Sequence, residues 1–144
     1  MIRFKSRMES LAMLLTTNAK PNRKRPNKQI VEFVSRIKTG SDALIMNPDW
    51  YETTFLYYSD INTFKDYIYA RKKLNIQGVF PLKSFLDINT INLDRYRRVI
   101  YLQVNNELGD PQNLIARSLE KKLKFAGTFK VYNCQITIYY QTPA

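Results

Sequence analysis

Residue types that commonly carry catalysis are scarce in this chain. The sequence contains no histidine and a single cysteine, Cys134. Without histidine, a Ser-His-Asp or Cys-His nucleophile is excluded, and the commonest ligand of zinc and iron sites is missing. Cys134 lies in a strand-like segment, so we interpret it as a small core residue. With one cysteine no internal disulfide can form, which is typical of a reducing compartment or of a subunit in an assembly without bridges.

Nucleotide and metal chemistry also find little support. The four glycines, at positions 40, 78, 109 and 127, do not have the spacing of G-x-G-x-x-G or G-x-x-x-x-G-K. Magnesium catalysis needs only oxygen ligands, and Pro48-Asp49 resembles the start of a nuclease motif, P-D…(D/E)-x-K. The one E-x-K, Glu120-Lys121-Lys122, lies far along the chain on a predicted helix. We therefore favour a plain turn at 47–49 and expect no catalytic residue, metal or cofactor.

Clusters of lysine and arginine are the remaining candidates. Residues 1–40 carry ten Lys/Arg and two Glu, so eight units of the net charge of +11 lie there. A segment containing Pro21 and Pro26 and no acid favours contact with phosphates, with a solvated loop as the alternative. The sequence predicts nucleic-acid contacts from Lys20, Arg23, Lys24, Arg25 and Lys28, from Arg71, Lys72 and Lys73, and from Arg95, Arg97 and Arg98. Ordinary solubility is the alternative for the last two groups and for Lys121, Lys122 and Lys124.

The ten tyrosines have two interpretations. They could include platforms on which bases stack. No RNP-type aromatic motif is present, and spacing typical of strands favours packing in a core or an interface. Tyr139 and Tyr140 make the terminal strand apolar on at least one face. If that strand lies at an edge of a sheet, it could pair with another subunit.

The elements that position these residues begin with two helices. Ser6-Arg7-Met8-Glu9 has the form of a capping box, and helical spacing of apolar residues predicts a short amphipathic helix over 7–17. The Pro-flanked stretch 18–28 is a loop. Asn27 can cap a second helix that ends near Gly40. The apolar stripe of this helix comprises Ile30, Val31, Phe33, Val34 and Ile37.

The middle of the chain mixes strand and helix patterns. Residues 43–46 predict a buried strand, and 53–58 are rich in strand formers. Asp60 or Asn62 can cap a helix that runs to about Lys73. We expect Ile61, Phe64 and Ile68 to face inward on that helix. Gly78-Val79-Phe80-Pro81 breaks the pattern, and Leu82, Phe85 and Leu86 indicate one helical turn.

The last third of the chain has the clearest pattern. Residues 98–104 are apolar on both faces, which is typical of a central strand. Asp110 as N-cap and Pro111 at the first helical position predict a helix start, and Gly127 is the expected end. Residues 128–141 then predict one long strand. This strand–helix–strand unit completes the prediction.

These patterns predict an α+β fold, with N-terminal helices followed by a small mixed sheet and a C-terminal strand–helix–strand unit. We divide the chain into a basic helical N-terminal region with a Pro-flanked connector, 1–40, and a compact α+β body, 41–144. No apolar run approaches the roughly twenty residues of a membrane span, and no secretory signal is evident. We expect a location in the cytoplasm or within a nucleoprotein particle or virion.

Charge and the lack of catalytic residues favour a non-catalytic structural or assembly protein that docks a basic surface onto nucleic acid, RNA or DNA. A ribosomal-type or nucleoprotein component would have these properties, and further protein subunits would be its partners. The alternative is a phage virion subunit. Over about the last 45 residues, the order of strand, Asp-Pro-started helix and terminal apolar strand is loosely similar to the C-terminal half of phage tail-terminator and neck proteins, which implies a symmetric ring. A third hypothesis is binding to a membrane surface through the 7–17 helix.

Overall fold

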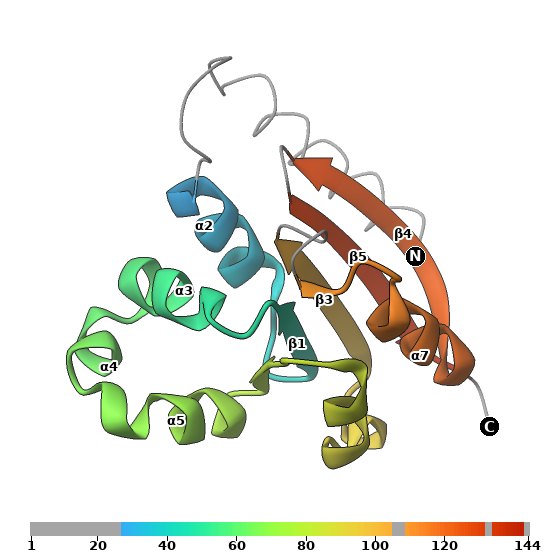
Figure 1. Ribbon diagram of the computed structural model, residues 1–144, viewed down its shortest axis with the longest axis horizontal. Helices are drawn as coiled ribbons and strands as arrows, with labels where there is room; N and C mark the ends of the chain where they lie inside the picture. Colours follow the sequence, from blue (N-terminus) through green and yellow to red (C-terminus); the bar gives the residue numbers. More distant parts are fainter. Residues whose placement is uncertain (1–26, 105–108, 132–133, 143–144) are drawn as a thin grey trace.

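One mixed sheet of five strands organises the molecule. The structure, a computed structural model, describes residues 27–104, 109–131 and 134–142. The strand order is β2-β1-β3-β5-β4, and helices pack against both faces of the sheet (Figure 1). The fold is α+β, as the sequence predicts. None of the helices in the described ranges is long and apolar enough to cross a membrane.

The elements have the following bounds. The helices are α2 (Asn27–Ile37), α3 (Tyr51–Ser59), α4 (Ile61–Lys65), α5 (Ala70–Ile76) and α7 (Leu114–Lys122), with 3₁₀ turns η1 (Tyr67–Tyr69), η2 (Phe85–Thr90) and η3 (Leu93–Arg95). The strands are β1 (Asp42–Asn47), β2 (Val79–Pro81), β3 (Arg98–Val104), β4 (Leu123–Val131) and β5 (Cys134–Gln141). The predicted 7–17 helix and most of the 18–28 loop lie outside the described residues.

The sheet has a parallel part and an antiparallel part. β1 lies between β2 and β3 and is parallel to both, with Asp42 opposite Arg98 at the start of the β1–β3 pair. β5 runs antiparallel to β3 on one side and to β4 on the other. All seven residues of β3 are buried, which confirms the predicted central strand. β4 is therefore an edge strand, and the tyrosine-bearing β5 is an inner one.

Hydrophobic clusters cover both faces of the sheet. On one face α2, α3 and α5 pack against β1, β3 and β5, whereas α7, η2 and η3 cover the other face. The stripe predicted for α2 is confirmed, since its five members are all buried: Ile30, Val31, Phe33, Val34 and Ile37. α2 therefore shares the core of the sheet. The division into 1–40 and 41–144 stays a prediction.

Residues 53–58, expected to be a strand, belong to the helix α3. The turn at Pro48 starts this helix, because its carbonyl accepts a hydrogen bond from the Tyr51 amide at 3.1 Å. Tyr51, Phe55 and Leu56 are buried on one side of the helix. Packing of that side against the sheet overrides the local preference of threonine and tyrosine for strands.

The helix predicted through Lys73 is divided. Asp60 caps α4, as expected, and its carboxylate accepts from the Thr63 amide at 3.2 Å. The chain then leaves helical geometry at Asp66, and η1 and α5 follow. Phe64 packs against the core, but Ile61 and Ile68 are exposed, so the inward orientation expected for these two was wrong.

The C-terminal elements also differ from their predicted bounds. α7 begins at Leu114 and not at Pro111, although Asp110 still caps it by accepting from the amides of Leu114 and Ile115, both at 2.9 Å. The helix ends at Lys122, and the strand predicted over 128–141 is a hairpin of β4 and β5. Gly127 lies inside β4, beside a register shift. The short strand β2 was not predicted, because its three residues are too few to show an alternating pattern.

Candidate functional site

Two of the predicted basic clusters meet in one hollow, although 24 residues separate Arg71 from Arg95 along the chain. Arg71 and Lys72 come from α5, and Arg95 comes from η3. The hollow has a volume of about 710 Å³. It is lined by Ile68, Arg71, Lys72, Asn75, Ile76, Arg95 and Tyr96, and none of these lining residues is acidic. We call these seven residues the basic hollow.

The start of β1 brings the two segments together. α5 leads through Gly78 into β2, and the Gly78 carbonyl accepts from the Leu44 amide at 2.7 Å. η3 leads into β3, where the Arg97 amide donates to the Ser41 carbonyl at 2.9 Å. Because β2 and β3 flank β1, the segments that precede them lie at the same end of the sheet. Sequence alone does not reveal this placement, since it depends on strand order.

Lys38 adds a cation next to the basic hollow. A Cβ atom placed on Gly78 would lie 3.2 Å from the Tyr96 ring and 3.5 Å from the Lys38 Nζ. Gly78 has a φ of +77°, a conformation open to glycine, and this lets the three residues crowd together. Burial lowers the pKa of the Lys38 ammonium, and the Asp42 carboxylate opposes that shift only in part.

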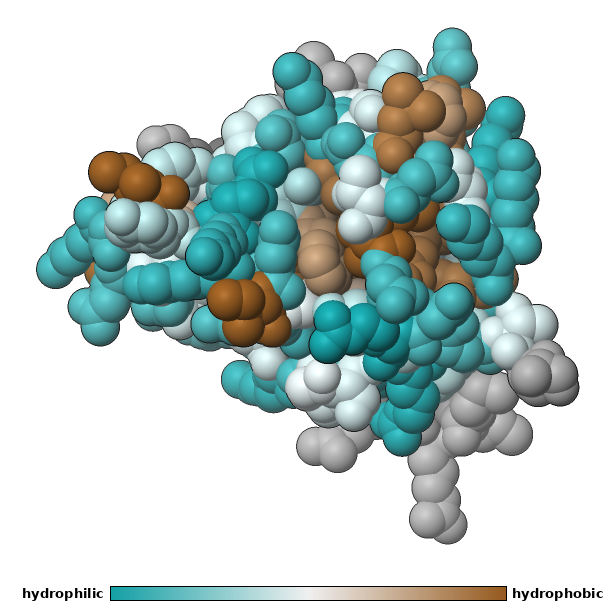
Figure 2. All heavy atoms as spheres, turned by 90° about the horizontal axis from the view of Figure 1, so that it is seen from below, coloured by the Kyte–Doolittle hydropathy of each residue, from teal (hydrophilic) through white to brown (hydrophobic). Residues whose placement is uncertain are grey.

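The surface around α4 and α5 is hydrophilic with scattered apolar side chains. Figure 2 shows the molecule from below, with mostly hydrophilic residues over these helices and a few isolated hydrophobic ones. Ile68 is 87% and Ile76 is 78% exposed, and both border the basic hollow. The hollow therefore combines cations with exposed apolar groups.

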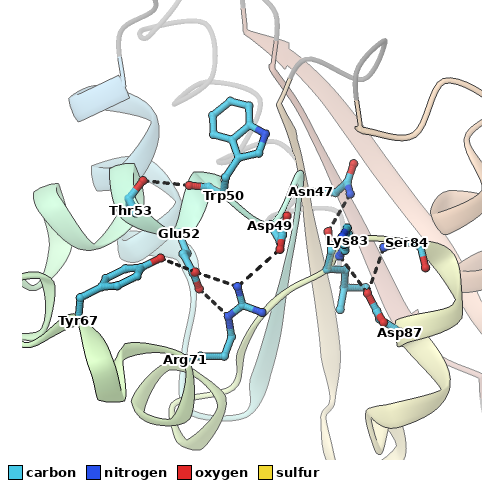
Figure 3. Close-up of polar contacts among 11 residues, drawn as sticks. Asn47, Asp49, Trp50, Glu52, Thr53, Tyr67, Arg71, Lys83, Ser84 and Asp87 are labelled. Atoms are coloured by element: carbon cyan, nitrogen blue, oxygen red, sulfur yellow. Dashed lines mark hydrogen bonds and ion pairs between the residues drawn. The ribbon is translucent and has the colours of Figure 1, made fainter.

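Arg71 is held by a polar network at the carboxyl end of β1 (Figure 3). Its Nε donates to Glu52 Oε2 at 2.6 Å and its Nη2 to Glu52 Oε1 at 2.8 Å. The Tyr67 hydroxyl donates to the same Oε1 at 2.7 Å, and Asp49 lies 3.7 Å from Arg71 Nη2. This network ties α3 to η1 and α5.

The network shifts the pKa values of Glu52, Tyr67 and Arg71. Burial alone would raise the pKa of the Glu52 carboxyl, but hydrogen bonds from Arg71 and Tyr67 hold it below its ordinary value. The bond to Glu52 raises the pKa of Arg71 and that of Tyr67. Arg71 is therefore a cation that Glu52 already neutralises, so Lys72 and Arg95 supply the uncompensated charge of the hollow.

Polar residues at the neighbouring strand end are structural. The Asn47 amide donates to the Leu82 carbonyl at 2.8 Å, and Asp87 Oδ2 accepts from the amides of Lys83 and Ser84 at 2.9 and 3.0 Å (Figure 3). The first bond connects β1 to the segment between β2 and η2, and the other two cap η2. The carboxylate of Asp87 is thus occupied by backbone donors.

The residues of the nuclease-like pattern are not brought together. Asp49 lies beside Arg71 on the α3 side of the sheet, whereas Glu120 lies on α7, which packs on the opposite face. In the described ranges, no group of three or more Cys, Asp or Glu residues is placed to hold a metal ion. The absence of enzymatic activity stays a prediction.

Arg98 is a correction to the predicted nucleic-acid contacts. It is 3% exposed, and its Nη2 donates to Asp42 Oδ2 at 2.6 Å and to the Ile37 carbonyl at 2.7 Å. Its Nε donates to the other Asp42 oxygen at 3.1 Å. Asp42 is fully buried. The Arg98 side chain therefore links β3 to α2 and β1, and its charge cannot reach a phosphate.

The remaining predicted cations lie apart from the hollow or outside the described residues. Lys73 and Arg97 are exposed, but they do not line it. Lys28 is exposed in the first turn of α2, at the other end of that helix from Lys38, about 15 Å along the helix axis. Lys20, Arg23, Lys24 and Arg25 are outside the described part of the chain.

Sequence reasoning missed the other lining residues. Tyr96 lies beside a predicted cluster, but nothing marked it as a wall of the hollow. Ile68 and Ile76 are spaced by eight residues around Lys72, and this helical periodicity could have indicated a shared exposed face. Compared with protein-family models, with curated proteins and with solved structures, the chain gives no significant match to any of them.

Proposed function

We propose that this protein docks non-catalytically onto nucleic acid, and that the basic hollow is one of its phosphate-contacting surfaces. The convergence of Arg71, Lys72 and Arg95 on one hollow without an acidic lining residue carries the proposal. Lys72 and Arg95 are exposed and form no ion pair with an acidic side chain among the described residues. Lysine and arginine that neutralise phosphates release the cations condensed on a nucleic acid, so the affinity of such a surface rises at low salt.

The division of roles in the hollow supports phosphate contact. Glu52, itself bonded by Tyr67, holds Arg71 in one orientation, whereas Lys72 and Arg95 present exposed charges to solvent. Cations of this kind contact the phosphate backbone of a nucleic acid and do not distinguish its bases. Binding should therefore depend strongly on salt and weakly on sequence, as expected of a nucleoprotein component that also contacts other protein subunits.

A charge-reversal experiment tests the proposal. The double variant Lys72→Glu, Arg95→Glu is compared with a control of equal charge change, Lys65→Glu, Lys83→Glu, at two exposed lysines that do not line the basic hollow. Fluorescence anisotropy with labelled RNA and DNA is measured between about 50 and 200 mM salt. The hollow variant should bind at least tenfold more weakly, and its salt slope should fall by about two, one for each contact.

Two results would contradict the proposal. One is a wild-type protein that binds neither RNA nor DNA at the lowest salt. The other is a control variant that weakens binding as much as the hollow variant, because net charge alone would then explain the effect. Reversal of Arg23, Lys24 and Arg25 in a third variant measures the part contributed by the N-terminal cluster.

A further inference from the structure

A second hollow, of different chemistry, lies between α7 and the β3–β5–β4 part of the sheet. Its volume is about 250 Å³. Its floor is formed by three cross-strand pairs, which are Gln103–Gln135, Thr128–Thr137 and Phe125–Tyr139. The floor thus changes from amides through hydroxyls to aromatic rings. We call this site the polar groove.

A bulge in β4 produces this floor. The register shifts between Phe125 and Gly127, so Phe125 pairs with Tyr139 while Thr128 pairs with Thr137. In a regular strand, residues three apart point to opposite faces. The extra residue puts Phe125 and Thr128 on the same face, and bulges that re-aim side chains in this way are common beside functional sites.

The helix α7 forms the wall of the polar groove. Asn113, Arg117 and Glu120 follow one another at helical spacing along the side that borders the groove. The side-chain oxygen Oδ1 of Asn113 accepts from the side-chain Nε2 of Gln103 at 3.3 Å, which joins wall and floor. Arg117 and Glu120 have opposite charges, so the groove is neutral overall, in contrast to the basic hollow.

Groups in the groove can recognise a flat polar ring. Gln135 is half-buried, and its side-chain amide makes no hydrogen bond within the described residues, so it offers both a donor and an acceptor. Phe125 is 51% exposed and packs edge-on to Tyr139, with ring centroids 6.2 Å apart. Burial and the nearby Glu120 raise the pKa of Tyr139, so its hydroxyl keeps its proton.

We propose that the polar groove binds an unpaired nucleobase. Glutamine amides make paired hydrogen bonds to base edges, and bases stack on exposed aromatic rings such as Phe125. The neutral wall has no excess charge for a phosphate, and the amide and hydroxyl floor is unsuited to an aliphatic chain. This site goes beyond the docking function proposed above, because it requires none of the residues of the basic hollow.

Uncharged nucleosides test the polar groove separately from the basic surfaces, because they carry no phosphate. Adenosine, guanosine, cytidine and uridine are titrated into the full chain, and binding is followed by NMR chemical shifts. At least one nucleoside should bind saturably, and Phe125→Ala should weaken it roughly 5- to 150-fold, the range for loss of one stacked base. Gln135→Leu should weaken it as well and change the order of preference among the four bases.

Matched controls separate this proposal from the docking function. Phe85→Ala removes an exposed phenylalanine from η2, outside the groove, and should leave nucleoside binding unchanged. Lys72→Glu, Arg95→Glu should also leave nucleoside binding unchanged while weakening binding of RNA or DNA. Loss of nucleoside binding in this hollow variant would contradict the assignment to the groove.

Three results would overturn the proposal. They are no saturable binding of any nucleoside, equal affinity in Phe125→Ala and wild type, and equal affinity for methyl riboside, which would indicate a sugar site. If Phe125→Ala does not fold, Gln135→Leu decides alone, because Gln135 lies half-buried in the floor. Persistent salt-dependent binding of RNA or DNA alongside any of these results would leave the docking function intact.

Discussion

Substituting Arg98 by methionine should strongly destabilise the fold. The change removes two hydrogen bonds to Asp42 and one to the Ile37 carbonyl, and it leaves a fully buried carboxylate without its cation. Breaking a buried ion pair from one side costs about 3–5 kcal/mol. Whole domains have about 5–15 kcal/mol of stability, so this loss is a large share of the total.

Urea unfolding followed by the fluorescence of Trp50, the only tryptophan, measures this loss. With a slope of about 1–3 kcal/mol per molar urea, the midpoint should fall by at least about 1 M. The double variant Arg98→Met, Asp42→Asn should recover part of the lost stability, because it removes the unpaired buried charge. The side-chain oxygen of the new asparagine can still accept from the backbone N–H of Thr39, which lies 2.8 Å from Asp42 Oδ2 in the wild type.

The neighbouring Arg97→Met is the matched control, because Arg97 is exposed. Its effect on the free energy of unfolding should stay within about 0.5 kcal/mol. The structural role of the Asp42–Arg98 pair would be refuted if both variants lost the same free energy of unfolding, or if Arg98→Met lost less than about 1 kcal/mol. A folded Arg98→Met protein that binds nucleic acid more weakly than wild type would refute it as well.

Three further substitutions test single features. Glu52→Gln should lower the free energy of unfolding by about 1–3 kcal/mol at neutral pH. Because the folded-state pKa of Glu52 is lowered, its contribution is present above the unfolded pKa and is lost as pH falls through the folded pKa, so urea midpoints of variant and wild type should converge in acid. Gly78→Ala should cost about 1–2 kcal/mol in thermal melts, since φ is +77° and the new Cβ would lie 3.0 Å from the Asp42 carbonyl, whereas Gly40→Ala, with open space around it, should have little effect. Asp60→Ala should cost about 0.5–2 kcal/mol in urea because α4 loses its cap, and Asp66→Ala, which removes no side-chain cap, should cost less.

Elements with a strong burial pattern were predictable from the sequence. The stripe of α2 and the continuous apolar run of β3 identify both elements within a few residues of their bounds. In each case one pattern extends over seven or more residues and matches a single secondary-structure period. Local preference and tertiary packing agree there, so no information beyond the sequence was needed.

Prediction failed where packing opposed local preference. Threonine and tyrosine at 53–58 favour a strand, but the turn at Pro48 and burial of Phe55 and Leu56 make a helix. The 128–141 segment was predicted to be one strand because positions 132–133 contain neither glycine nor proline. Glycine in particular is a usual mark of a hairpin turn. The sequence therefore could not show that β5 is inner and that β4 is the edge.

For the candidate sites, the sequence identified some of the residues but not their arrangement in space. The sequence identifies Arg71, Lys72 and Arg95 as cations, but strand order brings them together, and burial removes Arg98. The polar groove depends on pairing between β4 and β5, which no periodicity predicts. Gly127 was the available signal, since a glycine inside a strand pattern suggests a bulge.

The ring-forming hypothesis stays a prediction, with a changed geometry. Its topological argument used a helix started by Asp110 and Pro111 and a terminal strand, whereas α7 starts at Leu114 and the terminal strand β5 has a neighbour on each side. If subunits pair through the sheet on this side, the strand available is β4. Its exposed Lys124 and Lys130 would oppose pairing with an identical edge.

The mixed sheet has a consequence for the order in which the protein folds. In the β4–β5 hairpin, Val131 pairs with Cys134, three residues away, whereas Asp42 in β1 pairs with Arg98, 56 residues away. Hairpins form in about 1–10 μs, and distant pairings are delayed by the entropy of closing a long loop. The hairpin should therefore nucleate the sheet, and the Asp42–Arg98 pair should form late. In stopped-flow kinetics, substitutions at Thr128 or Thr137 should mainly slow folding, whereas loss of Arg98 should mainly speed unfolding.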